Sequence, residues 1–154
     1  MALLGDSLAR RVKEQLRDKI DALDDISVVY TFIRIPPEQW PAVFITYGDI
    51  DGEFSSNTHN QRTYSFRVTL MYQIGHDLHD VTHERMQYGE EAVGQTVESI
   101  LNQIETDYDL GNLNAEVLFV RAMDVTHDEA EFEGGYAKRA QFNVDVVTEH
   151  NVSS

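Results

Sequence analysis

The stretch YSFRVTLMYQI, residues 64–74, decides the fold because apolar and polar side chains alternate along it. Apolar residues take every even-numbered position, and Met71 is the one interruption among the polar residues at the odd-numbered positions. A period of two is typical of a β-strand with one face in the core and the other toward solvent. We therefore predict a long strand over Thr63–Ile74 that is buried on one face.

Two segments on either side of this strand carry apolar residues at the three- and four-residue spacing of amphipathic helices. The first helix is expected over Asp6–Leu23, with Ser7 or Asp6 as its N-terminal cap. The second is expected over Thr82–Tyr108. Each helix has one apolar stripe to bury, so both are expected to cover the sheet.

Four further strands complete the expected sheet, at Val28–Ile33, Ala42–Tyr47, Glu116–Val125 and Tyr136–Val147. The order is then helix, three strands, helix and two strands. This order predicts an α+β fold in one domain over residues 1–150, with an antiparallel or mixed sheet of about five strands and both amphipathic helices on one face. Residues 151–154 are expected to form a frayed C-terminal tail.

Two loops rich in small polar and acidic residues are expected over Gly48–Gln61 and Thr126–Gly135. The first is longer than the two to five residues that a hairpin turn needs. Long loops on a rigid sheet often carry function, so we expect Gly48–Gln61 to reach a neighbouring subunit. The strand Glu116–Val125 is apolar on both faces, which predicts a central position or a subunit contact.

The composition is strongly acidic, with 27 acidic residues against 12 basic ones and a formal net charge of −15. Such a surface repels phosphates, so sequence-specific binding of nucleic acid is not expected. Acidic surfaces with few lysines resemble those of proteins from salt-loving organisms, in which salt screens the self-repulsion; an ordinary acidic protein is the alternative. No apolar run of 18 residues occurs, so no membrane-spanning helix is expected.

Three histidines, His76, His79 and His83, form the one cluster suited to a metal, because on a helix this spacing would present three imidazoles to zinc. However, Gly75 and Asp77 indicate a connection between a strand and a helix, and no glutamate stands where the zinc-protease motif HExxH has one. Solvated loop histidines are therefore the expected interpretation, and a metal-dependent enzyme is the alternative.

Other catalytic or ligand-binding motifs are missing from the sequence. The segment DIDGE, residues 49–53, superficially resembles a calcium loop, but the ligand positions of an EF-hand are not filled, which leaves only weak binding of a divalent cation open. No Walker A motif, dinucleotide fingerprint or nucleophile elbow occurs. We therefore expect no enzymatic activity, no cofactor, and no catalytic or metal-binding residue.

The order of elements resembles that of the tail-terminator (tail-completion) proteins of long-tailed viruses. The resemblance covers nearly the whole chain and lies in pattern rather than in an invariant motif. The features that carry it are the N-terminal helix (Leu8–Leu23), the PAVFI strand at residues 41–45, the long loop, the NQRTYSF entry at residues 60–66 into the alternating strand, the second helix and the closing strands.

This resemblance implies a structural virion protein that forms a homohexameric ring, assembled in the host cytoplasm and located at the tail–neck junction. Such a ring caps the tail tube, ends its polymerisation and faces a neck (connector) protein, while genomic DNA passes through the lumen without specific binding. Ring closure requires two different, complementary surfaces on each subunit. The acidic composition fits a virus of a halophilic archaeon. A neck protein, either a head–tail adaptor or a stopper, is the alternative of the same class.

Four residues are candidates for contact with the tube or with a neighbouring subunit. Phe54 is apolar within the expected polar loop, and Phe119 belongs to the strand that is apolar on both faces. Arg62 and Arg67 can bridge to acidic neighbours, although Arg67 is equally consistent with a plain surface residue on the solvent face of its strand.

Overall fold

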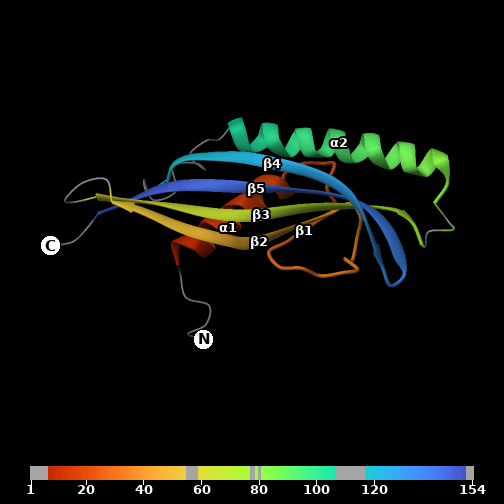
Figure 1. Cartoon of the computed structure of the whole chain (residues 1–154), viewed down its shortest axis with the longest axis horizontal. Helices are drawn as coiled ribbons and strands as arrows, with labels where there is room; N and C mark the ends of the chain where they lie inside the picture. The colour runs from red at the N-terminus through yellow and green to blue at the C-terminus, as the bar shows by residue number, and fades with distance from the viewer. Residues whose placement is uncertain (1–6, 55–58, 77–78, 80, 107–116, 152–154) are drawn as a thin grey trace.

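The computed structural model describes residues 7–54, 59–76, 79, 81–106 and 117–151, which form an α+β fold in one domain (Figure 1). A five-stranded mixed sheet has the order β1-β2-β3-β5-β4. Strand β1 pairs in parallel with β2, and the other neighbours are antiparallel. The elements are α1 (Leu8–Asp21), β1 (Val28–Tyr30), β2 (Ala42–Phe54), β3 (His59–Gly75), α2 (His83–Thr106), β4 (Val117–Phe132) and β5 (Gly135–Asn151).

Both helices pack on the same face of the sheet, as predicted. From α1, residues Val12, Leu16 and Ile20 are fully buried at a spacing of four, which places them on one helical stripe. They share a core cluster with the buried stripe of α2 and with inward-facing residues of β2, β3 and β5. The predicted cap at Ser7 is confirmed, because its Oγ accepts a hydrogen bond of 3.2 Å from the backbone N–H of Arg10.

The alternating stretch in β3 lies in the centre of the sheet, between β2 and β5. Its even-numbered residues from Tyr64 to Leu70 belong to the core beneath the helices. Met71, the one apolar residue at an odd-numbered position, is also buried. It lies on the other face of the sheet in a second small cluster with Ala42, Phe44 and Ala137. The interruption in the pattern therefore marks a place where both faces of the sheet are covered.

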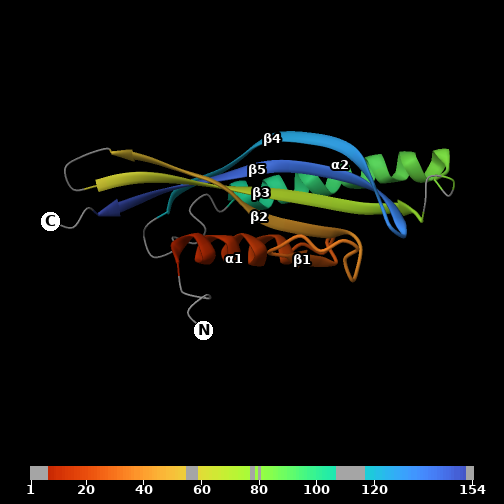
Figure 2. The same ribbon diagram turned by 60° about the horizontal axis from the view of Figure 1, so that its bottom comes forward.

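The expected loop over Gly48–Gln61 is wrong. Strand β2 continues through a bulge after Tyr47 and pairs with β3 as far as Phe54 and Asn60, so only residues 55–58 separate the two strands. This end of the sheet projects past both helices (Figures 1 and 2). Strands there need no apolar face to cover a helix, so they carry the polar composition of a loop.

The expected loop over Thr126–Gly135 is also wrong. Strand β4 continues to Phe132, and a tight turn at Glu133 and Gly134 joins it to β5. Gly134 has a φ of +86°, which only glycine adopts without strain. Strand β5 likewise continues past the expected end at Val147 to Asn151, and residues 152–154 of the expected tail lie outside the described residues.

Other bounds differ less from the predictions. Strand β1 ends at Tyr30 rather than Ile33. Helix α2 begins one residue later than expected, and the backbone of α2 approaches the sheet closely at Gly89, where an added Cβ would lie 2.4 Å from the Ile74 side chain. The strand expected at Glu116–Val125 is not central, because β4 is an edge of the sheet; residue 116 lies outside the described residues.

Candidate interaction surfaces

The sheet ends in two unlike edges. At one edge, β1 covers only Ala42–Phe44 of β2, and α1 lies beside it. At the other edge, β4 pairs with β5 along its inner side only. We call α1 together with residues 31–35 the α1 edge, and β4 together with its turn at residues 133–134 the β4 edge. Open strand edges are sites at which chains associate unless they are short, bulged or charged, so the chemistry of each edge determines what it binds.

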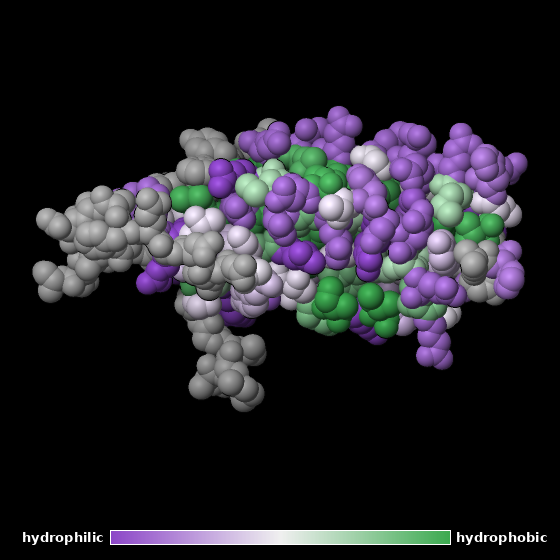
Figure 3. Space-filling view, in the orientation of Figure 1, coloured by the Kyte–Doolittle hydropathy of each residue, from purple (hydrophilic) through white to green (hydrophobic). Residues whose placement is uncertain are grey.

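The α1 edge carries exposed apolar side chains. Phe32, Ile33 and Ile35 are 55%, 53% and 45% exposed, within four consecutive positions just after β1. Figure 3 shows apolar surface gathered where Figure 1 places the connection between β1 and β2. Contiguous exposed apolar surface in a protein of this size marks a binding site more often than isolated apolar residues do.

An aromatic frame holds this apolar segment in place. The ring of Tyr30 stacks on buried Phe44 at 5.6 Å between centroids and contacts Phe32 at 5.5 Å. The Tyr30 hydroxyl accepts a 2.9 Å hydrogen bond from the backbone N–H of Glu38, whose carboxylate pairs with Arg34. The exposed side chains are thus fixed on an ordered support, which lowers the entropic cost of binding.

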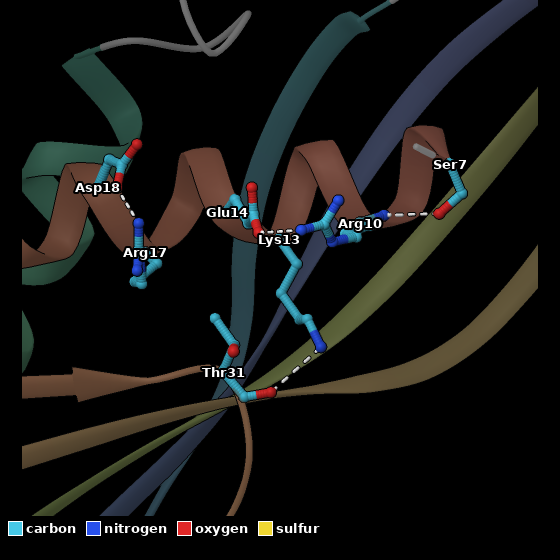
Figure 4. A network of polar contacts seen from close by, with 7 residues as sticks. All are labelled: Ser7, Arg10, Lys13, Glu14, Arg17, Asp18 and Thr31. Carbon is cyan, nitrogen blue, oxygen red and sulfur yellow. Dashed lines mark hydrogen bonds and ion pairs between the residues drawn. The ribbon is translucent and has the colours of Figure 1, made fainter. Parts of the chain in front are cut away.

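Helix α1 gives the same edge a basic character. It holds five basic and three acidic residues, whereas the whole chain is acidic. Its exposed side carries the ion pair of Arg10 with Glu14, and Lys13 extends from the helix to the carbonyl of Thr31 at 3.1 Å (Figure 4). Lys13 Nζ also lies 3.8 Å from the ring centroid of Tyr47. Partial burial lowers the pKa of Lys13.

The β4 edge is acidic and irregular. It holds four acidic residues and one basic residue in β4 itself, and Glu133 adds another acid in the turn. The pairing register shifts between Met123 and Thr126, and Asp124 within this bulge has a φ of +59°. Val125 beside it is 36% exposed. The bulge interrupts the edge and leaves an apolar side chain partly exposed beside Asp124.

A buried lysine ties the β4 edge to α2. Lys138 of β5 is 5% exposed, and its Nζ lies 2.8 Å from Glu129 of β4 and 2.5 Å from Glu90 of α2. Burial acts to lower the pKa of Lys138, but its hydrogen bonds to the two carboxylates outweigh burial and raise it. The same contact lowers the pKa of Glu90. One buried cation thus joins three elements.

The helix-free face of the sheet is largely polar. Ser65 donates a 2.6 Å hydrogen bond to Asp145, and the Gln141 amide donates one of 3.2 Å to Thr69. Near the β4–β5 turn, Arg139 makes two hydrogen bonds to the carboxylate of Asp128, of 2.8 and 2.6 Å. These cross-strand pairs satisfy polar side chains of this face within the chain itself.

The four predicted contact residues come from three strands, with Phe54 and Arg62 on the same projecting β2–β3 hairpin. Arg67 is exposed on the helix-free face, where it lines a hollow of about 180 Å³ together with Asp124. Arg62 is exposed on the projecting end of β3. The backbone places Phe54 at the end of β2 and Phe119 at the start of β4, but both side chains lie outside the described part of the chain. The structure does not bring these four together, and their contact roles stay predictions.

Sequence reasoning missed the apolar segment at the α1 edge, because Phe32 and Ile33 were assigned to the first strand. A usable signal was present. Alternation in that strand is poor after Tyr30, and the apolar residues run directly into Pro36 and Pro37, which exclude regular strand pairing. Apolar residues outside any regular element have no sheet face to bury them.

The histidines do not form a metal site in the described part of the chain. His76 follows β3, His79 lies in the connection and His83 begins α2, and all three are exposed. No group of three or more potential metal ligands occurs among the described residues. His76 and Arg85 line an open hollow of about 570 Å³ between the end of β3 and the start of α2. Nor does either described helix have the length and apolar character needed to cross a membrane.

Comparison with known proteins found a shared fold in a solved structure. The chain is similar to a chain in the structure of the virion of a native gene transfer agent (GTA) particle, with a TM-score of 0.55. The match covers 95% of this chain and 100% of that one at 11% sequence identity, so it establishes a shared fold. No protein-family model matches the sequence, and no curated protein sequence matches it.

Proposed function

We propose that this chain is a structural protein of a virion, and more specifically the tail terminator of a long-tailed virus. The observation that carries the proposal is the fold shared along almost the whole chain with a component of a GTA virion particle. The α+β order that suggested a tail terminator from the sequence is also the order observed. A fold alone does not determine a role, so the surfaces must supply the rest of the argument.

The two unlike edges support assembly into a ring. A closed ring needs a heterologous contact, in which one surface of each copy binds a different surface of the next. An apolar, basic edge opposite an acidic edge provides two surfaces of that kind. In the proposed role, six copies close into a hexamer that caps the tail tube and ends its polymerisation at the tail–neck junction.

The acidic composition supports passage of DNA through such a ring. Six copies of a chain with a charge of −15 repel phosphates strongly, so genomic DNA moves through the lumen without binding to it. The projecting β2–β3 hairpin, which carries Phe54 and Arg62, is the proposed contact with the tube protein, and a neck protein binds the opposite face. The role requires no catalysis and no cofactor.

A neck protein, either a head–tail adaptor or a stopper, is the second candidate. The same shared fold and the same two edges support it, because neck proteins are also ring-forming virion components. The two candidates differ in the partner: a terminator binds the end of the tail tube, whereas a neck protein binds the head side.

The test is polymerisation of the tail tube protein with and without this chain. A terminator in sub-stoichiometric amounts is expected to shorten the tubes and to appear at one tube end in electron micrographs. Tubes of unchanged length, together with binding to a connector protein, would shift the assignment to the neck.

The measurement is made in about 2 M salt and again in low salt, because salt screens the repulsion between copies of so acidic a chain. In a halophilic virus the ring is expected at high salt.

A further inference from the structure

The exposed apolar segment of the α1 edge has no cover among the described residues. Phe32, Ile33 and Ile35 are each about half exposed, although Tyr30 and Phe44 beneath them are packed against one another. Leaving these side chains in water costs about 25 cal/mol for each Å² of apolar area that a partner could bury. The segment is thus a favourable place for a protein partner.

Charge indicates which partner covers it. The apolar segment adjoins α1, the helix with five basic and three acidic residues, through the contact of Lys13 with Thr31. An acidic partner surface complements this edge. The β4 edge of the chain itself has that character, because Asp124, Glu131 and Glu133 are exposed there. Asp128 and Glu129 of the same strand are already paired with Arg139 and Lys138.

Backbone geometry singles out the β4 edge as well. Asp124 adopts a φ of +59°, a conformation that non-glycine residues rarely take and that is found preferentially at functional sites. The bulge leaves Val125 partly exposed beside Asp124. An apolar side chain beside a carboxylate, on an acidic strand, matches an apolar segment that adjoins a basic helix.

We infer that the α1 edge binds the β4 edge of a second copy of this chain, head to tail. The inference rests on the ring assembly proposed above and assigns its contact surfaces. The two edges lie at opposite ends of the strand order, so each copy uses one edge to bind the preceding copy and the other to bind the next. A stable contact buries about 800 Å² on each partner, so the exposed side of α1 takes part together with the apolar segment.

Salt acts on this contact in two directions. It screens the attraction between the basic and acidic edges, and it also screens the repulsion between two copies of net charge −15. The apolar part of the contact is not screened, and strongly hydrated salts strengthen it. The apolar segment therefore holds the ring together at high salt, where the ion pairs contribute least.

Two variants test the inference, each with one edge disabled. Ile33→Glu with Ile35→Glu places carboxylates in the α1 edge, and Asp124→Arg with Val125→Arg places cations in the β4 edge. All four residues are exposed or partly exposed, so both variants are expected to fold, which circular dichroism and thermal melting check. Tyr88→Glu is the matched control, because Tyr88 is 65% exposed on α2 and outside both edges.

Under the conditions in which the wild type forms a ring, each variant alone is expected to remain monomeric, with self-association at least tenfold weaker. A mixture of the two variants is expected to give at least a 1:1 dimer, because each variant supplies one intact edge and the two altered edges carry opposite charges. The control is expected to form rings like the wild type. Analytical ultracentrifugation measures all four samples.

Three results would overturn the inference, and they are distinguishable. If the α1-edge variant forms normal rings but no longer binds tube protein, the apolar segment binds the tube instead. If the mixture stays monomeric, the contact is isologous or lies elsewhere; in both cases the proposed virion ring stands. If the wild type is monomeric at every salt concentration, with and without tube protein, the ring itself fails together with the inference.

Discussion

The two edges of the sheet limit strand pairing with other chains in different ways. At the α1 edge, a three-residue parallel strand covers the beginning of β2, and an apolar segment on an aromatic frame follows it. At the β4 edge, a strand of 16 residues is left open on its outer side but carries a bulge and four carboxylates. Neither edge invites uncontrolled strand pairing. The difference shows how one sheet can resist aggregation and still present two chemically different surfaces, which we propose bind each other.

The comparison also shows where the charge of the chain lies. Five of the 12 basic residues are in α1, whereas α2 and β4 hold nine acidic residues between them. A uniformly acidic monomer would repel its own copies at every orientation. Segregation makes one relative orientation much less unfavourable than the rest, and this orientation is the one that the edges require.

The largest expected loss of stability comes from a substitution in the hydrophobic core that both edges share. Phe66 is 1% exposed in β3 beneath the helices. Truncation by Phe66→Ala removes core contacts and leaves a cavity, so the free energy of unfolding is expected to fall by about 3–5 kcal/mol. Denaturant titration measures the loss. Hydrogen exchange that accelerates at one edge alone would contradict a common core.

A smaller effect, confined to the β4 edge, is expected from Lys138→Ala. The substitution leaves the carboxylates of Glu90 and Glu129 without their shared cation and removes a buried aliphatic chain. Loss of such a charged network is expected to cost about 1–3 kcal/mol. Hydrogen exchange should rise in β4 and the first half of α2 while α1 stays protected. Equal loss of protection in α1 would show that the two edges are not independent.

The corresponding substitution at the α1 edge is Lys13→Ala. It removes the hydrogen bond to the Thr31 carbonyl and the contact with the Tyr47 ring. Because Lys13 is only partly buried, the expected loss is about 0.5–1.5 kcal/mol, measured by thermal melting. Ring formation should weaken as well, because the apolar segment loses its attachment to α1. An unchanged ring in a less stable monomer would remove α1 from the contact.

The smallest expected effect is a loss of local stability in mild acid. It compares the two edges without any substitution. Lys138 lowers the pKa of Glu90 below its ordinary value of 4.5, and Arg139 lowers that of Asp128 below 3.8. Groups with depressed pKa values stabilise the fold above their unfolded values, and this stability is lost as the pH falls through the folded ones. Below about pH 4, amide exchange should therefore rise first in the β4–β5 hairpin. Earlier exchange in α1 would contradict this order.

The alternation in residues 64–74 was enough to predict a strand buried on one face, because a sheet face beneath two helices selects apolar residues at every second position. The helices were predictable for a similar reason. The projecting β2–β3 hairpin was not, because strands outside the helix layer lose that selection and acquire a loop-like composition, as in β2 beyond Tyr47.

The interaction surfaces were harder to predict than the fold. The edge position of β4 depends on its pairing with β5 alone, which local pattern does not encode. Phe32 and Ile33 have the composition of a strand, but β1 ends at Tyr30, so they lie outside one. A surface of this kind is formed by tertiary contacts, so the pattern around a single residue such as Arg67 does not reveal it, and the contact role of Arg67 stays a prediction.

The most direct test of the contact between the two edges is cross-linking in the double variant Ile33→Cys with Val125→Cys. The natural chain contains no cysteine, so a short thiol cross-linker reacts at the introduced positions alone. A head-to-tail contact predicts a ladder of covalent multimers ending at the closed ring, with no product beyond a dimer for either single variant. If the double variant yields no more multimer than the control pair Ile33→Cys with Tyr88→Cys, the two edges do not meet and the account is wrong.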